Sequence, residues 1–170
     1  GLIPQLYQRL NNRLSSSESD VTKDVKAILW GQRWIWVGDS FVAAEEVALT
    51  ATINATPYLY QLPQDLRVYS RLLNIFQVRS VFEPRDYVTA LYRMAESTGQ
   101  LEDDKSGEDK VLLDAEVDLA CQLVTQVSTE GSITSIASKG IYAPDNTGRL
   151  ALSISLMYDD VPWMSGPQYV

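Results

Sequence analysis

Side chains suited to chemistry are few in this chain. Its 170 residues include no histidine, which removes the usual general base near neutral pH and the commonest zinc ligand. The single cysteine, Cys121, lies on the flank of the apolar face of a helical stretch, and no histidine or basic cluster near it in the sequence would lower the pKa of its thiol. We therefore expect Cys121 to be a buried structural thiol. One cysteine makes neither an internal disulfide nor a cysteine-held metal site.

Paired carboxylates are the remaining candidates for acid and base catalysis. Glu45-Glu46 and Asp159-Asp160 each place two carboxylates next to each other in the sequence, and glycosidases use a pair of acidic residues. Adjacent residues of a strand point to opposite faces, however, so each pair is better interpreted as a solvated edge. We predict no catalytic residue and no enzyme. The enzyme alternative would require a concave pocket with convergent carboxylates of perturbed pKa.

The segment Asp145-Asn146-Thr147-Gly148 superficially resembles a calcium-binding loop. It lacks the oxygen-rich 12-residue spacing and the terminal glutamate of an EF-hand, so we expect no metal there. Proline followed by Asp-x-x-Gly between two apolar runs is typical of a turn, because Pro144 sets φ and Gly148 accepts a positive φ. Gly38-Asp39 is likewise predicted to form a hairpin turn.

Ligands that carry phosphate are disfavoured by motif and by charge. The chain has no GxxxxGK[ST] loop, no GxGxxG, and no Asp-x-Gly-x-Gly with Glu-x-x-x-Asn as in GHKL-type ATPases. A formal net charge of −8 repels nucleic acid and anionic lipid. No apolar run approaches the roughly 20 residues that span a bilayer, and no charged-then-apolar leader is present. We expect no cofactor, no nucleic acid or membrane partner, and a reducing intracellular location in the cytoplasm.

Tryptophans are the side chains best suited to binding a partner protein. Trp34 and Trp36 alternate with Ile35, so both point to one face of a strand. Either one face of this strand packs on the core while the other takes a helix, or the tryptophans form an aromatic platform for a partner, since tryptophan is enriched in interface hot spots. Trp34, Trp36 and Trp163 are therefore the candidate partner contacts. Solvent exposure distinguishes the two interpretations.

The tryptophan strand belongs to a hairpin pattern that occurs twice. Residues 34–42 read as a strand, a Gly-Asp turn and a returning hydrophobe, and residues 141–150 repeat this order around a Pro-Asp turn. Aligning Phe41 with Leu150 places Val47 opposite Leu156 without a gap. We predict two β-hairpins or small sheets, each followed by a short apolar tail.

Apolar periodicity predicts about five amphipathic helices around these hairpins. The helical stretches lie at about 3–14, 21–29, 66–76, 84–95 and 110–127. Residues 50–63 contain two prolines in an irregular apolar pattern, which indicates a loop or a short edge strand. The stretches at 66–76 and 84–95 are expected to form a compact pair. The predicted fold class is therefore α+β.

The acidic segment 99–109, with the sequence GQLEDDKSGED, suggests where the chain divides. It is nearly devoid of apolar residues, and we expect a mobile surface loop. It would separate a helical and first-hairpin lobe, residues 1–98, from a lobe with the long helix and second hairpin, residues 110–170. The two lobes would either be separate or share one core.

Four segments together resemble the large repeats of sacsin and sacsin-like giant proteins. The first is the W-hydrophobic-W-x-G-x-x-F hairpin at 34–41, and the second is the helix from Asp65 that ends in the step Gln77-Val78. The third is the F-x-x-x-D-Y-x-x-x-L helix at 82–91. The last is a PD-x-x-G-x-L segment at 144–150 that closes with Tyr158 to Trp163. The resemblance covers nearly the whole chain, roughly Leu6 to Trp163.

This resemblance implies a non-catalytic role. In that family a long repeat begins with a region related to the ATPase domain of the ninety-kilodalton heat-shock chaperone, and the ATP-site residues lie outside the part that this chain resembles. The chain would be a C-terminal part of one repeat that spaces or couples ATPase-like modules, with neighbouring modules or other proteins as partners. It would act in chaperone-linked protein quality control or cytoskeletal organisation. The alternative is a freestanding adaptor that uses the Trp34/Trp36 face. The oligomeric state stays open.

Overall fold

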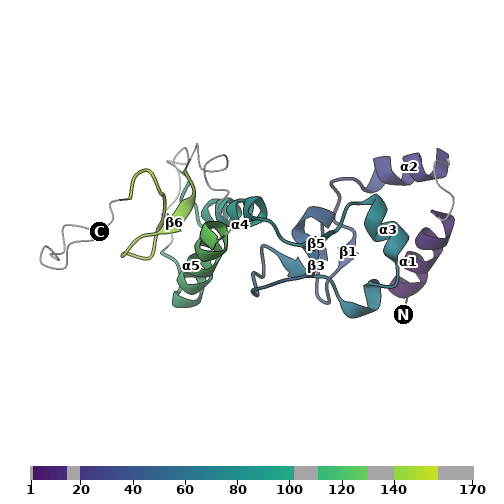
Figure 1. Ribbon diagram of the computed structural model, residues 1–170, viewed down its shortest axis with the longest axis horizontal. Coiled ribbons are helices and arrows are strands. Elements are labelled where there is room, and N and C mark those ends of the chain that lie inside the picture. The colour runs from purple at the N-terminus through teal and green to yellow at the C-terminus, as the bar shows by residue number, and fades with distance from the viewer. Residues whose placement is uncertain (1, 15–19, 102–110, 130–139, 157–170) are drawn as a thin grey trace, which may run out of the picture. The chain divides into compact units, whose positions relative to one another are not determined.

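The computed structural model describes residues 2–14, 20–101, 111–129 and 140–156 (Figure 1). These residues form five α-helices, two antiparallel hairpins and one parallel sheet of three strands. The predicted α+β class is therefore confirmed. The chain divides into two compact units, Gly1–Phe82 and Glu83–Val170, and each is described by itself.

The first unit contains three helices, two short 3₁₀ turns and five short strands. In chain order they are α1 (Leu2–Arg13), α2 (Asp20–Leu29), β1 (Ile35–Trp36), β2 (Phe41–Val42), η1 (Ala44–Glu46), β3 (Val47–Thr50), β4 (Tyr60–Gln61), η2 (Gln64–Leu66), α3 (Ser70–Ile75) and β5 (Arg79–Val81).

The first predicted hairpin is confirmed by the pairing of β1 with β2. The strands are antiparallel, with Ile35 opposite Val42 and Trp36 opposite Phe41. Gly38 in the connecting turn has a φ of 114°, a conformation that side chains with a Cβ rarely adopt. The Val37 N–H donates to the Ser40 carbonyl at 3.0 Å and closes the turn. Local turn chemistry therefore sets the register of this hairpin.

The apolar tail after this hairpin is the central strand of a parallel sheet in the order β4-β3-β5. Val47 pairs with Tyr60, and Ala48 pairs with both Gln61 and Arg79. The edge strand expected as one possibility within residues 50–63 is β4. Both Val47 and Ala48 are fully buried, as expected for the middle strand of a covered parallel sheet.

The core of the first unit is built from elements that are far apart in the sequence. Its buried apolar residues come from α1, the hairpin, β3, the segment that leads into η2, and α3: Tyr7, Leu14, Trp34, Ile35, Val42, Val47, Leu62, Leu66, Leu72, Leu73 and Phe76. The helix α1 lies against α3 (Figure 1). Burial of these side chains is the main source of stability, at about 25 cal/mol per Å² of apolar surface.

The helix predicted at 66–76 is interrupted. It consists of η2, a turn, and the six residues of α3. The end of α3 is a Schellman motif, in which the Val78 N–H donates to the Leu73 carbonyl at 3.0 Å and the Gln77 N–H to the Asn74 carbonyl at 3.1 Å. Gln77 occupies the left-handed position with a φ of 54°, where glycine is usual. This geometry accounts for the Gln-Val step that the sequence shows at the helix end.

The second unit contains α4 (Pro84–Ser97), α5 (Asp114–Thr129) and a hairpin of β6 (Tyr142–Pro144) with β7 (Leu150–Leu152). The helix α4 packs on α5 and on β6. Its predicted apolar face is confirmed, because Tyr87, Ala90, Leu91, Met94 and Ala95 are all buried.

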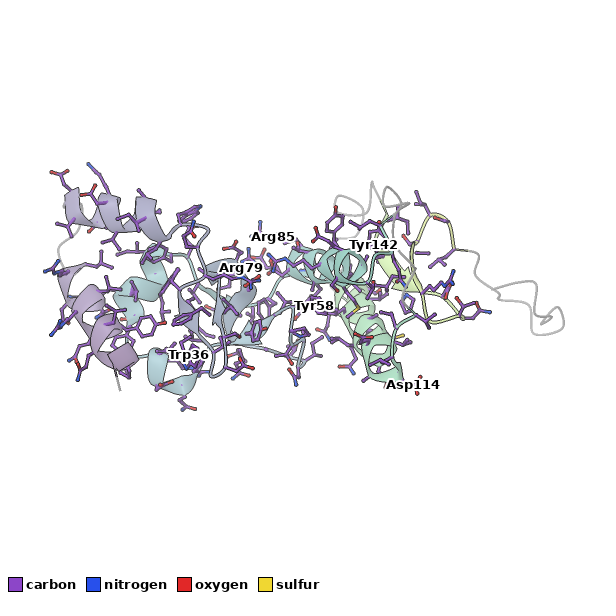
Figure 2. All side chains as sticks on the ribbon, turned by 180° about the vertical axis from the view of Figure 1, so that it is seen from behind. Trp36, Tyr58, Arg79, Arg85, Asp114 and Tyr142 are labelled. Carbon is purple, nitrogen blue, oxygen red and sulfur yellow. The ribbon has the colours of Figure 1, made fainter. Side chains whose placement is uncertain are left out.

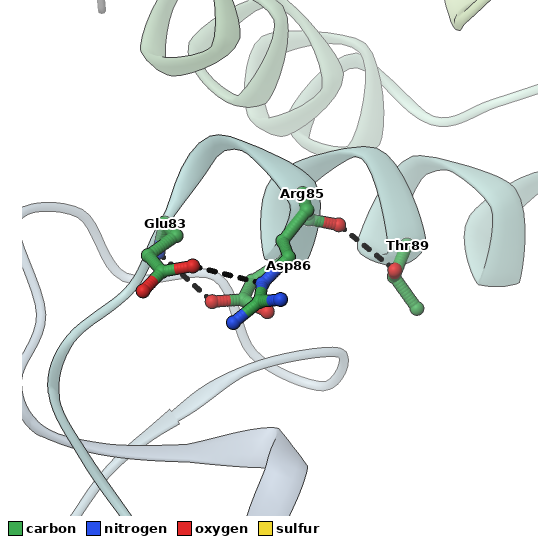
Figure 3. Close-up of polar contacts among 4 residues, drawn as sticks. All are labelled: Glu83, Arg85, Asp86 and Thr89. Carbon is green, nitrogen blue, oxygen red and sulfur yellow. Dashed lines mark hydrogen bonds and ion pairs between the residues drawn. The ribbon is translucent and has the colours of Figure 1, made fainter. Parts of the chain in front are cut away.

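The start of α4 is capped by its own side chains (Figure 3). The Glu83 N–H donates to Asp86 Oδ2 at 2.8 Å, and the Arg85 Nε lies 2.8 Å from Glu83 Oε2. The Thr89 hydroxyl donates to the Arg85 carbonyl one turn later. Asp86 is buried, and Pro84 stands in the first turn, where its missing N–H costs nothing. The FEPRDY segment is therefore a helix start.

The long helix α5 differs from prediction at its first end. Residue 110 was expected to begin it, but it begins at Asp114. Leu113, which lies inside the predicted stretch, is 65% exposed, because it precedes the helix and donates its N–H to Glu116 Oε2 at 2.8 Å. Ala120, Leu123 and Val127 are buried on one face, as expected of an amphipathic helix.

The division into units also differs from the one that composition suggested. The boundary falls between Phe82 and Glu83, whereas the sequence placed it at 99–109. The physical reason is that α4 packs on α5, so the acidic segment connects two helices of one unit. The helices expected to pair, at 66–76 and 84–95, belong to different units. Residues 102–110 lie outside the described residues.

Candidate interaction surface at the first hairpin

Tyr7 of α1 holds the tryptophan strand at its base. Its hydroxyl donates to the Trp34 carbonyl at 2.5 Å and accepts from the Trp36 N–H at 2.9 Å. Burial raises the pKa of Tyr7, the hydrogen bond from the Trp36 N–H lowers it, and the charge of Asp65 raises it; the net shift is upward. One neutral phenol thus satisfies two backbone groups of β1 and its flank. Sequence analysis placed Tyr7 inside the predicted helix at 3–14 and gave its hydroxyl no role.

Trp34 is part of the core. Its side chain is 8% exposed, and its ring lies 4.8 Å from that of Phe76 and 6.1 Å from that of Tyr7, centroid to centroid. Among the described residues, none provides a hydrogen-bond partner for the buried Trp34 Nε1. Ile35, on the other face of the strand, is completely buried. The base of the hairpin is therefore covered on both faces, as the first interpretation of the tryptophans expected.

Trp36 lies nearer the tip of the hairpin and is half-buried. Its ring stacks at a tilt on Phe41, directly opposite in the register, with 5.0 Å between the centroids. Phe41 is 44% exposed. The accessible aromatic surface is thus the pair Trp36 and Phe41, which we call the hairpin-tip pair. Sequence analysis missed Phe41 as a contact residue. The available signal was the two-residue turn Gly38-Asp39, because pairing across it places Phe41 opposite Trp36. Trp163 lies outside the described residues.

The carboxylates of the first pair have separate roles, which corrects the expectation of a solvated edge. Residues 44–46 form a 3₁₀ turn in place of a strand, and Glu46 is 6% exposed whereas Glu45 is exposed. Glu46 Oε2 accepts the Ala43 N–H at 2.9 Å, and Arg33 Nη2 lies 3.5 Å from Glu46 Oε1. Glu46 therefore caps the turn and balances its charge with an arginine. Asp159-Asp160 lies outside the described residues.

The Asp145 loop is a turn, as predicted. Asp145 Oδ1 accepts the N–H and hydroxyl of Thr147, both at 2.8 Å, and the Arg149 N–H at 2.9 Å. Gly148 has a φ of 75°. Burial alone would raise the pKa of Asp145, but the hydrogen bonds from Arg149 and Thr147, with the Arg149 charge, lower it below its usual value. The carboxylate is committed to the turn, and over the described residues no group of three metal-ligand side chains forms.

Cys121 is exposed, contrary to expectation. The buried face of α5 runs through Ala120, Leu123 and Val127. Cys121 directly follows Ala120 in the sequence and does not belong to this face. A rotation of about 100° per residue in an α-helix carries it to the solvent side.

Comparison with known proteins identifies no relative. No family model, no curated protein and no solved structure matches the chain. In the part of the chain that the structure describes, no helix is long and apolar enough to cross a membrane.

Proposed function

We propose that this chain is a non-catalytic structural and interaction segment of a sacsin-like repeat. Its physical role would be to space or couple chaperone-type ATPase-like modules inside the cell, most simply in the cytoplasm, in support of protein quality control or cytoskeletal organisation. Its partners would be neighbouring modules or other proteins. The proposal needs no cofactor, nucleic acid or membrane.

The observation that supports this role is what the motif residues do. In the hairpin motif Trp34 fills the core and Gly38 makes the turn. In the helix motif Asp86 caps α4, and in the closing segment Asp145 organises its turn. Residues typical of the repeat therefore serve packing, capping and turning, as expected of a module that spaces or couples its neighbours.

Two measurements test the proposal. In a titration of the chain with ATP and Mg²⁺ followed by calorimetry, we expect no saturable heat at micromolar protein, because the motifs engage in structural contacts. Micromolar ATP binding would contradict the claim that the nucleotide site lies in another module. In the second, the chain is mixed with an ATPase-like module of a sacsin-like protein, and we expect binding. If it binds such a module no better than it binds an unrelated acidic domain, the coupling role fails.

A freestanding adaptor is the second candidate, and the hairpin-tip pair favours it. Phe41 is 44% exposed and rests on Trp36, which makes a small aromatic surface of the type that anchors protein interfaces. Phe41→Ala should remove binding to such a partner, whereas Leu6→Ala, at a side chain 55% exposed on α1, should not. Equal binding by both variants would exclude the hairpin tip as the contact.

A further inference from the structure

A cavity lies at the carboxyl ends of the parallel strands in the first unit. Its volume is about 240 Å³, and its lining consists of Ala51, Thr52, Ile53, Asn54, Ala55, Leu59 and Gln61. Residues 51–59 directly follow β3, and Gln61 ends β4. Because β3 and β4 run parallel, these two ends meet at the same edge of the sheet.

This edge is where open parallel sheets bind ligands. The strand order β4-β3-β5 means that the chain leaves β3 toward one side and later returns to pair on its other side. In α/β sheets, ligands bind outside the carboxyl ends of the strands, next to the point where the strand order reverses in this way. The topology of the sheet and the position of the cavity therefore indicate the same edge.

The lining combines buried apolar residues with exposed polar ones. Ala55 and Leu59 are each 3% exposed, and the Leu59 N–H donates to the Ala55 carbonyl at 3.0 Å. Thr52, Asn54 and Gln61 are exposed. Among the described residues that line the cavity, none is charged and none is aromatic. An ion would therefore meet no counter-charge in the lining, and a nucleic-acid base would meet no ring on which to stack.

Two of the polar residues carry side-chain amides with capacity for further hydrogen bonds. Asn54 Oδ1 accepts the Thr56 hydroxyl at 3.0 Å, which leaves the Nδ2 group of Asn54 as a donor. The Gln61 amide has no hydrogen-bond partner among the described residues. A neutral carboxamide matches both groups, because its oxygen accepts from Asn54 and its N–H donates to Gln61.

We propose that this cavity binds a neutral carboxamide on a short alkyl chain, the group that ends a glutamine side chain. The alkyl part packs on Ala55 and Leu59, and the source is either a free small amide or a glutamine of a partner protein. Figure 2 labels Tyr58, in the loop that lines the cavity, and Trp36 at separate places in the first unit, so this site is distinct from the hairpin-tip pair. The inference goes beyond the role in a repeat, because it requires no ATPase-like neighbour.

The test is a titration of the ¹⁵N-labelled full chain by two-dimensional NMR. The probes share one shape: propanamide, the anion propanoate, and butanone, which keeps the carbonyl but lacks the N–H donors. Propanamide should shift the side-chain amide signals of Asn54 and Gln61 and the backbone N–H signals of Ala55 and Leu59, and we expect saturation at about millimolar concentrations. Propanoate and butanone should each bind at least about threefold more weakly, because each lacks the N–H donors.

A capped tripeptide separates the two sources of the carboxamide. Acetyl-Gly-Gln-Gly-amide carries the same group on a peptide chain, and its Glu counterpart is the control. If the Gln peptide shifts the same signals and the Glu peptide does not, the ligand is a glutamine of a partner protein. If propanamide alone shifts them, the ligand is a free small amide.

Variants of the two amides test the hydrogen bonds. Asn54→Asp keeps the oxygen that accepts from Thr56 and replaces the donor by a second acceptor. It should weaken propanamide by about threefold or more and favour propanamidinium, the cation of the same shape. Gln61→Ala should weaken propanamide by a similar factor, and it keeps the test valid if Asn54→Asp alters the loop. Gln64→Ala, at an exposed glutamine of η2 outside the lining, should change nothing.

Three outcomes would overturn the assignment. Equal or tighter binding of propanoate would show that the site does not select a neutral group. Equal binding of butanone would remove the N–H donors from recognition. Shifts that do not saturate, or that lie away from Asn54, Ala55, Leu59 and Gln61, would place the contact elsewhere.

Discussion

The strongest prediction concerns the Tyr7 hydroxyl, which joins α1 to the first hairpin. Tyr7→Phe keeps the ring, and with it the contact to Trp34. It removes the hydroxyl, which donates to the Trp34 carbonyl and accepts from the Trp36 N–H. A buried backbone group left without a partner costs about 1–3 kcal/mol; the bond to the Trp34 carbonyl is buried, and the bond from the Trp36 N–H is partly buried and adds less. We expect the free energy of unfolding to fall by about 2–4 kcal/mol, a large part of the roughly 5–15 kcal/mol that stabilises a domain.

The measurement is urea unfolding followed by tryptophan fluorescence, with the m-value compared between variants. Tyr69→Phe is the matched control, because its hydroxyl donates to the Pro4 carbonyl at 3.1 Å in an exposed setting where water can replace it. We expect it to cost less than about 1 kcal/mol. If Tyr7→Phe lies within the error of the control, the hydroxyl does not join α1 to the hairpin.

The same residue gives a pH signature with a defined sign. The pKa of Tyr7 is raised in the folded chain by burial, against the opposing Trp36 hydrogen bond, with Asp65 adding to the rise. A raised pKa means that its stabilising contribution is complete below the ordinary tyrosine value of about 10 and is lost as pH rises through the folded value. Unfolding curves from pH 9 to 11 should therefore show an alkaline loss of stability that is smaller in Tyr7→Phe. An identical loss in both proteins would refute this reasoning.

Three further predictions follow from local geometry. Gln77 and Gly99 both hold the left-handed position of a Schellman motif, with φ values of 54° and 69°, and only one of them is glycine. In urea unfolding, Gln77→Gly should therefore stabilise the chain by about 0.5–1 kcal/mol, and Gly99→Ala should destabilise it by a similar amount. Changes of the same sign would contradict this. Because the pKa of Asp145 is lowered in the folded chain, its carboxylate stabilises the fold at pH values above the unfolded pKa, and this stability is lost as the pH falls through the folded pKa. Asp145→Ala should therefore reduce the fall of the unfolding temperature between about pH 5 and 2. An unchanged fall would count against the turn network. Cys121 should react with a thiol reagent in native buffer as fast as in denaturant, because it is exposed, and protection in native buffer would show that α5 is rotated from its described position.

Helices and turns were predictable from sequence because their determinants are local. The apolar spacing at 84–95 predicted an amphipathic helix, and α4 (Pro84–Ser97) has a buried face there. The Asp145 turn and Gly38 were recognised from turn chemistry that involves residues only a few positions apart. The class of the fold followed from counting these elements.

Errors arose where the sequence pattern did not specify which side of an element is covered or which elements pack together. Adjacent carboxylates suggested a solvated edge, but Arg33 and a 3₁₀ turn bury Glu46. Cys121 lies close to an apolar stripe, and one residue of helical rotation decided its exposure. The acidic segment suggested a boundary because composition reports solvation and not which helices pack together.

Local sequence was enough to predict most of the helical segments, the two hairpins and the turns, because neighbouring residues carry the periodicity, the left-handed positions and the capping groups that form them. Long-range packing decided the parallel sheet, because the loop between β3 and β4 and the segment with η2 and α3 between β4 and β5 bring distant strands together, and it decided where the units divide. It also decided that Trp34 fills the core while Trp36 and Phe41 reach the surface. The physical reason is that burial depends on which distant elements cover a face, and alternation along one strand cannot specify them.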